Sequence, residues 1–227
     1  MVAGSEPLYD KRYQCLLCGR EFTNKRVRLR HIRQISRDSD FCGHFEGENP
    51  YFYEVMVCPN CGYAFTASFG PVKKERRQLI IDQYASKISR KDYSGPRTLA
   101  DALSVYKLGL LCANLNLERS SVMAGLCLHI AWFYRYSQEE AEEKRYLRYA
   151  CDLYREAYEK ESGSAKEMDP NLMLYLVGEL EGRLGNYQAA VRWLSRLMQE
   201  RGLQPYLREL LRERWEAYRE QMKAAQS

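Results

Sequence analysis

The sequence predicts an α+β protein that is mostly α-helical, with a small cysteine-rich module in front and an all-α domain behind it. Cysteine usage is the first indication, because five of the eight cysteines lie before residue 62. Glycine and proline also become sparse after Gly70-Pro71, and helical periodicity covers most of the chain from there on. We therefore place the domain boundary between residues 1–70 and residues 71–227.

Composition is that of a globular protein. The 227 residues are enough for one large or two small domains, and 45% of them are hydrophobic and 29% charged. The net charge of +5 permits an acidic partner without requiring one. The first residues lack the apolar core of a secretion signal, and no apolar run reaches the roughly 18 residues of a membrane span. We expect a cytoplasmic protein without membrane contact, in which paired cysteines indicate a metal before a disulfide.

Two stretches share the pattern C-x-x-C-G-x-x-F: CLLCGREF at 15–22 and CPNCGYAF at 58–65. In such a loop the glycine after the second cysteine takes a left-handed backbone conformation, so we expect one at Gly19 and at Gly62. The preceding stretches DKRYQ and YFYEVMV are predicted strands, the second more strongly. A strand before each loop is typical of a zinc ribbon. We therefore predict one structural Zn²⁺, held by four thiolates: Cys15, Cys18, Cys58 and Cys61.

The segment between the two motifs is long for such a site. It has 39 residues, against about 15 to 20 in compact sites, so it must have structure of its own. We predict a short basic helix from Asn24 to Ile35, followed by a turn-rich stretch. The long loop costs little, whereas a structural zinc contributes on the order of 10 kcal/mol to folding.

Cys42 leaves the ligand set open, because it lies beside His44 in C-x-H. In one interpretation Cys42 is a spare thiol, either buried or reactive. In a second interpretation Cys42 or His44 is an alternative ligand, which replaces one of the four thiols. In a third interpretation His31, Cys42 and His44 bind a second metal.

No catalytic motif is found. Four thiolates leave no open position for a substrate, and the chain lacks H-E-x-x-H, a P-loop and G-x-S-x-G. The nearby acids are interpreted as turn and cap residues: Asp38, Asp40, Glu46 and Glu48. We therefore predict a protein that is not an enzyme.

The second half is predicted to be helical throughout. The expected helices are 73–88, 98–115, 121–136, 137–160, 170 to the break at Gly185, 187–199, and a last one from Pro205. Ser137 is the predicted cap of the fourth, with Glu140 three residues on, and Asp169-Pro170 opens the fifth.

A spaced pattern of small and bulky residues recurs in these helices. The copies are Ala102–Tyr106–Gly109, Ala150–Tyr154–Ala157 and Ala190–Leu194–Leu197. Around the third copy, Gly178, Gly185, Tyr187 and Ala190 resemble a tetratricopeptide helix pair over about one unit. The copies start 48 and 40 residues apart, against about 34 in a regular array. We predict a tetratricopeptide-like domain of irregular helical hairpins stacked into a short solenoid. The alternative is an ordinary helical bundle.

The N-terminal motifs carry a more specific resemblance. LYDKRYQCLLCGREFTNKRVR, 8–28, and RDSDFCGHFEGENPYFYEVMVCPNCGYAF, 37–65, resemble an uncharacterised bacterial family, domain of unknown function 2225. The resemblance covers nearly the whole chain and implies a metal-binding front and a tetratricopeptide-like back, with no assigned activity. Its motif maps onto Cys15, Cys18, Cys58 and Cys61 and includes Cys42.

Three functions follow as hypotheses. The first is an interaction protein whose helical face binds a protein or peptide, with Tyr106, Tyr154, Tyr187 and Trp193 as candidate face residues, although aromatic residues at helical spacing are more often core. The second is nucleic-acid binding through Lys25, Arg28 and Arg33 on the basic helix, with bases stacked on the aromatic residues of 50–53. Its alternative is a solvated helix whose arginines pair with nearby acids. The third is a redox or metal sensor built on Cys42.

Overall fold

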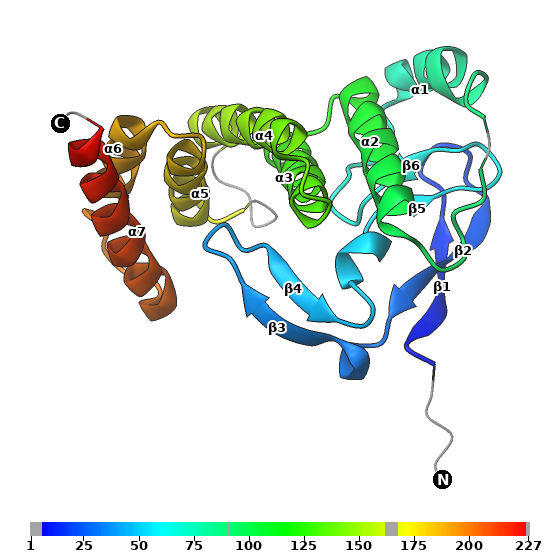
Figure 1. The fold of residues 1–227 in the computed structure, drawn as a ribbon. Helices are drawn as coiled ribbons and strands as arrows, with labels where there is room; N and C mark the ends of the chain where they lie inside the picture. The colour runs from blue at the N-terminus through cyan, green and yellow to red at the C-terminus, as the bar shows by residue number, and fades with distance from the viewer. Residues whose placement is uncertain (1–5, 90, 162–167, 226–227) are drawn as a thin grey trace, which may run out of the picture. The chain divides into compact units, whose positions relative to one another are not determined.

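The computed structural model describes residues 6–89, 91–161 and 168–225. These residues form seven α-helices and three two-stranded antiparallel sheets, and all the strands end by Phe65 (Figure 1). The predicted fold class, α+β and mostly α, is confirmed.

The chain divides into two compact units, but not at Gly70-Pro71. The N-terminal unit consists of residues up to Arg37 together with Gly43–Glu118, and the helical unit consists of Asp38–Cys42 together with Arg119 onward. The predicted boundary is wrong because the first two helices pack with the sheets. Tyr106 and Cys112, for example, are buried within the N-terminal unit, at 1% and 0% exposure.

Two short ribbons in the N-terminal unit flank the cysteine motifs. Strands β1 (Leu8–Gln14) and β2 (Glu21–Val27) pair from Leu8↔Val27 to Gln14↔Glu21. Strands β5 (Met56–Val57) and β6 (Ala64–Phe65) form the second ribbon. Each C-x-x-C therefore lies in the turn of a hairpin, and the predicted strand at DKRYQ is confirmed.

The stronger strand prediction, YFYEVMV, holds only for Met56–Val57. Residues Pro50–Tyr53 instead form a 3-10 turn, η2, because Asn49 accepts a hydrogen bond from the Tyr51 amide at 2.9 Å. The buried Arg97 then donates to the carbonyls of Phe52 and Val55, at 2.9 and 2.7 Å. These contacts override the β propensity of the aromatic residues.

The predicted basic helix at 24–35 is wrong. Its residues form the end of β2, a 3-10 turn η1 (Leu29–His31) and strand β3 (Arg33–Arg37), which pairs with β4 (Gly43–Glu46). Pairing with β1 satisfies the backbone, and the buried Asn24 side chain accepts from the amide of Val57 at 2.9 Å. Tertiary contacts here outweigh the weak helical preference of an arginine-rich stretch.

Two helices complete the N-terminal unit. Helix α1 (Lys74–Ile80) continues into a π-turn, η3 (Ile81–Ala85), and α2 (Leu99–Asn116) contacts both α1 and β6. A capping box starts α2, because Thr98 accepts from the Asp101 amide while Asp101 accepts from the Thr98 amide.

The helical unit contains α3 (Ser120–Tyr136), α4 (Glu140–Lys160), α5 (Pro170–Arg183), α6 (Tyr187–Leu197) and α7 (Pro205–Ala224). Each helix contacts the next one along the chain (Figure 1). Asp169 caps α5 and Pro170 opens it, as predicted. The predicted cap at Ser137 is wrong, because Ser137 closes α3 and Glu139 precedes α4.

A search for helices of the length and apolar character that a bilayer crossing requires found none in the part of the chain that the structure describes.

Candidate metal centre

The two cysteine motifs fold into matching loops. The amide of Cys15 donates to the carbonyl of Arg20 at 2.9 Å, and that of Cys58 donates to Tyr63 at 3.0 Å. Gly19 and Gly62 have φ of +75° and +74°, and each amide donates to the carbonyl of the first cysteine of its motif. The left-handed glycines predicted from the sequence are therefore present at both positions.

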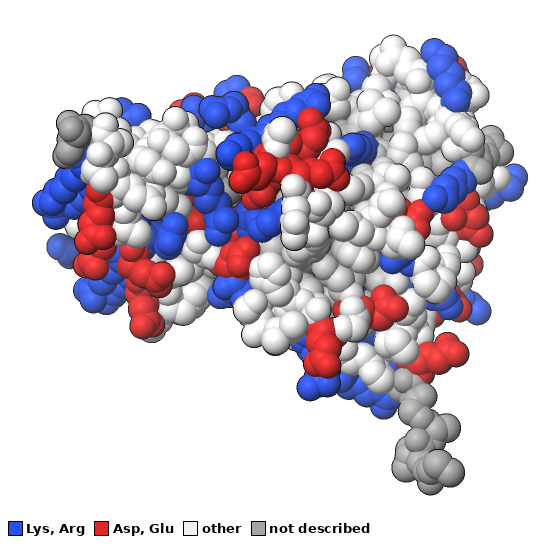
Figure 2. Space-filling view, viewed as in Figure 1, with Lys and Arg blue, Asp and Glu red and all other residues white. Residues whose placement is uncertain are grey.

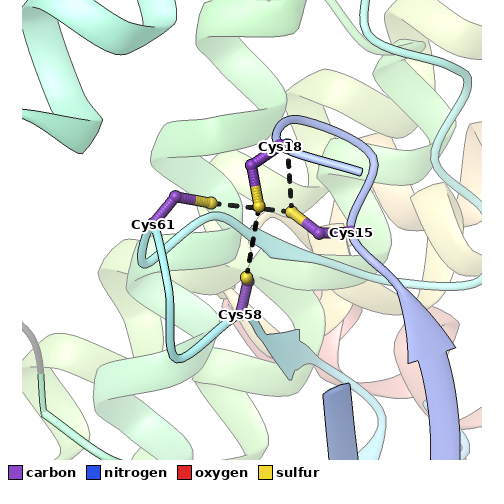
Figure 3. Close-up of side chains that lie close together, drawn as sticks. All are labelled: Cys15, Cys18, Cys58 and Cys61. Atoms are coloured by element: carbon purple, nitrogen blue, oxygen red, sulfur yellow. Dashed lines mark hydrogen bonds between the residues drawn. The ribbon is translucent and has the colours of Figure 1, made fainter. Parts of the chain in front are cut away.

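The four cysteines of these loops converge (Figure 3). Their Sγ atoms all lie within 4.8 Å of one another, with 3.5 Å between Cys15 and Cys61 and 3.7 Å between Cys18 and Cys58. A tetrahedral ion with bonds of about 2.3 Å to sulfur holds its ligands about 3.8 Å apart. The four thiols are thus spaced as such a site requires, and they could hold a metal ion.

Hydrogen bonds favour negative charge on part of this cluster. The thiol of Cys61 donates to Cys15 and lowers the pKa of Cys15 to about 5, while the pKa of Cys61 is raised in return. The amide of Cys18 also donates to the sulfur of Cys15 at 3.4 Å, and Asn60 Nδ2 donates to the sulfur of Cys18 at 3.5 Å. Such N–H donors stabilise thiolates, which are the ligating form of cysteine.

Several supporting residues had no signal in the sequence. Arg20 donates to Asn60 at 2.7 Å and so joins the two loops. Tyr84, from the turn after α1, donates to the carbonyl of Gly62 at 2.7 Å, and Arg77 of α1 donates to the carbonyl of Leu17. The sulfur of Cys112, on α2, accepts from the amide of Ala64 at 3.4 Å. Helices beyond the expected boundary therefore hold the loops in place.

Cys42 is not one of the converging thiols. It belongs to the helical unit, is 0% exposed and donates to the hydroxyl of Tyr136 at 3.4 Å. Burial raises the pKa of Cys42 to about 12. Both observations count against a reactive thiol, because reactivity requires exposed thiolate.

The histidines considered beside Cys42 lie in local backbone structure. His44 is half-buried in β4 opposite Ser36, and His31 ends the turn η1. With four cysteines already converging, a ligand replaced by Cys42 or His44 is not needed to complete a tetrahedral set. A second metal at His31, Cys42 and His44 stays a prediction.

The three candidate nucleic-acid contacts do not share a helical face. Lys25 pairs with Asp10 at 3.0 Å, Arg33 pairs with Glu46 at 3.2 Å, and the guanidinium of Arg28 lies 5.1 Å from the centre of the Tyr9 ring. On the face drawn in Figure 2, basic side chains are interspersed with acidic ones. The geometric premise of the nucleic-acid hypothesis is therefore wrong, while binding itself stays an untested prediction.

Two of the aromatic residues considered for a binding face are core residues. Tyr106 and Tyr154 are 1% and 3% exposed. Tyr187 is half-buried and stacks on Tyr218 with ring centres 6.1 Å apart. Trp193 is also half-buried and meets Tyr158 edge-on.

Fold and site together define a mostly helical α+β protein with a buried four-cysteine centre near its N-terminus. Comparison with protein families then identifies the family of the chain. The model of a family described as "Uncharacterized protein conserved in bacteria (DUF2225)" matches residues 8–218, so the chain belongs to this family. The resemblance seen in the cysteine motifs is confirmed. A search of curated proteins and a search of solved structures each found no match.

Proposed function

We propose that this protein is a non-enzymatic zinc-binding scaffold, in which one structural zinc staples the N-terminal unit and the helical unit binds a protein or peptide partner. The convergence of Cys15, Cys18, Cys58 and Cys61 carries the proposal. Four thiolates fill a tetrahedral shell, so the ion has no open position for a substrate or a water nucleophile.

The donor set favours zinc. Thiolates are soft ligands, and a tetrahedral set of four selects zinc or an iron–sulfur centre over hard cations. Three of the four cysteines are buried and two accept N–H hydrogen bonds, which suits a site that serves folding. The two flanking ribbons, β1–β2 and β5–β6, are two-stranded and gain stability from such an ion.

A depression on the helical unit supports partner binding. It has a volume of about 410 Å³ and is lined by Leu203, Pro205, Arg208, Glu209 and Arg212. A second depression of about 230 Å³ shares part of this lining and adds Met198. Met198 is 44% exposed, and Tyr206, which follows the lining residue Pro205 in the chain, is 52% exposed. Exposed methionine, tyrosine and arginine are the residues that protein interfaces favour.

Site-specific photo-crosslinking in cells that express the full chain tests this function. A photo-reactive residue in place of Tyr206 should give a discrete protein adduct, which Arg208→Glu combined with Arg212→Glu should remove. The control places the same group at Ser104, an exposed position on α2. No adduct from Tyr206, or the same adducts from both positions, would overturn partner binding at this surface.

A further inference from the structure

The segment Asp38–Cys42 belongs to the helical unit, although its chain neighbours on both sides belong to the N-terminal unit. It follows β3 and precedes β4, so it is the tip of the hairpin that these two strands form. Its side chains are half-buried or fully buried. We call the residues of the helical unit that receive it the cradle: Trp132, Arg135, Tyr175, Glu179, Arg183 and Arg214.

Arg135 is the main contact of the cradle. Its guanidinium donates two hydrogen bonds to Asp40, at 2.7 and 3.0 Å, one to Asp38 at 2.7 Å and one to Glu143 at 2.7 Å. Trp132 Nε1 also donates to Asp40, at 3.1 Å. Asp40 does have a turn contact, because its carboxylate accepts from the amide of Cys42 at 3.4 Å. Turn contacts alone do not describe Asp38 and Asp40, however, because both carboxylates are also bound by α3.

Asp40 is held as a carboxylate although its side chain is 0% exposed. Burial alone would raise the pKa of Asp40, but the hydrogen bonds of Arg135 and the charges of Arg135 and Arg183 lower it below its usual value. A buried carboxylate in a bidentate arginine pair is a specific recognition contact, because the planar guanidinium fixes both distance and direction.

Ser39 is bound through its backbone as well as its side chain. The hydroxyl of Tyr175 donates to the Ser39 carbonyl at 2.8 Å. Arg183 donates to the Ser39 hydroxyl at 3.0 Å, and this hydroxyl donates to the buried Glu179 at 2.5 Å. Arg214 donates to the same Glu179 carboxylate at 3.0 Å, which keeps its charge compensated.

Phe41 completes the contact. Its ring packs against Tyr175 with ring centres 5.5 Å apart, and its φ is +69°. A positive φ is strained for a residue that has a Cβ atom, so the contacts of the segment must offset this strain. The segment therefore resembles a bound peptide, with side chains, one backbone carbonyl and a strained backbone all fitted to the helices.

The division of roles between cradle and segment points to a ligand class. The cradle offers donors from two arginines, one tryptophan and one tyrosine, and the segment offers two carboxylates and a carbonyl as acceptors. Leaving such buried or half-buried donors without partners is costly. An empty cradle would thus favour another acidic segment of the form Asp-x-Asp-aromatic.

We propose that the cradle is a recognition site for an acidic peptide segment, which residues 38–42 occupy in cis and for which a partner with an Asp-x-Asp-aromatic segment competes. The inference rests on the proposed scaffold function and adds to it a second peptide site, which shares no residue with the lining of the larger depression. Because a tethered segment acts at an effective concentration in the millimolar range, only an abundant or tight competitor displaces it.

A peptide-binding experiment on the full chain tests the inference. The double variant Asp38→Asn with Asp40→Asn keeps the shape of the segment but weakens its hold on the cradle. A fluorescent peptide of residues 37–43 should bind this variant at least about tenfold more tightly than it binds the wild-type chain, in which the tethered segment competes. The matched peptide with both aspartates replaced by asparagine should not bind, and adding Arg135→Ala to the variant should abolish binding.

Two results would overturn the inference. Absence of peptide binding to the folded variant would make the segment a purely structural contact, and equal binding to variant and wild type would place the peptide elsewhere. If the variant does not fold, its helicity is measured by circular dichroism with and without each peptide. Helicity that the acidic peptide restores and the asparagine peptide does not would support peptide binding by the cradle, and no restoration by the acidic peptide would contradict it. The crosslink at Tyr206 is independent of these results, so failure here leaves the scaffold function testable by itself.

Discussion

The four-cysteine centre and the arginine cradle are both polar clusters that join distant parts of the chain, but they are stabilised in different ways. In the proposed function the first is completed by an ion from outside, since four thiols alone give one another only weak hydrogen bonds. The second is complete within the chain, because the carboxylates of Asp40 and Glu179 are matched by three arginines. We therefore expect the two units to respond to different perturbations.

The largest expected effect is that of metal removal. Chelation should unfold the ribbons of the N-terminal unit, since a structural zinc contributes on the order of 10 kcal/mol. The helices α4 to α7 contain none of the four ligands and should keep their structure. Hydrogen exchange followed by mass spectrometry would show protection lost in β1, β2, β5 and β6 and retained in α4–α7. Equal loss in both units would contradict the comparison.

Breaking the cradle should act on the helical unit. Arg135→Ala leaves the buried Asp40 without its main partner, which typically costs about 3–5 kcal/mol. The control is Arg145→Ala, because Arg145 is 56% exposed and its pair with Glu142 is screened by water, so that it contributes little to stability. Urea unfolding followed by circular dichroism compares the two variants. Similar losses would mean that the cradle adds nothing beyond a surface ion pair.

Helix packing offers a third comparison, at the contact between α5 and α7. A Cβ at Gly182 would overlap the ring of Tyr218, so Gly182→Ala should destabilise the helical unit by about 1–3 kcal/mol. A Cβ at Gly125 meets only the hydroxyl of Tyr154, at an ordinary 3.9 Å. Gly125→Ala should thus be neutral or stabilising by up to about 1 kcal/mol. Thermal unfolding of both variants measures the difference, and two destabilised variants would contradict this packing.

Lowering the pH should destabilise the cradle by a smaller free energy than the substitutions above, because it acts through the carboxyl group of Asp40. The pKa of Asp40 is lower in the folded chain than the value of about 3.9 expected when unfolded. Its contribution to stability is therefore fully present above pH 4 and lost as the pH falls through the folded value. The difference in unfolding free energy between wild type and Asp40→Asn should narrow below pH 4. A constant difference down to pH 2 would show that Asp40 does not titrate with folding.

The convergence of the four cysteines could be predicted from the sequence because the information for their loops is local. Two C-x-x-C-G motifs predict their own loops, and the left-handed Gly19 and Gly62 are as expected. The helices after residue 98 were also predictable, since their apolar periodicity and the cap at Asp169 are local signals.

The features that the sequence did not predict depend on contacts between residues far apart in the chain. Arg97 fixes η2 from 45 residues away, and pairing with β1 turns the expected basic helix into strand. Arg135 binds Asp38 across 97 residues, and no pattern around either residue marks that pair. The cradle could therefore not be predicted from spacing, whereas the cysteine loops could.

Metal analysis of three purified full-length chains tests the central claim most directly. Native mass spectrometry should find one zinc in the wild type and in Cys42→Ser, because Cys42 is not among the converging thiols. Cys58→Ser should contain none, since it removes one of the four ligands. Zinc retained at full occupancy in Cys58→Ser, or lost in Cys42→Ser, would contradict the assignment of the site to Cys15, Cys18, Cys58 and Cys61.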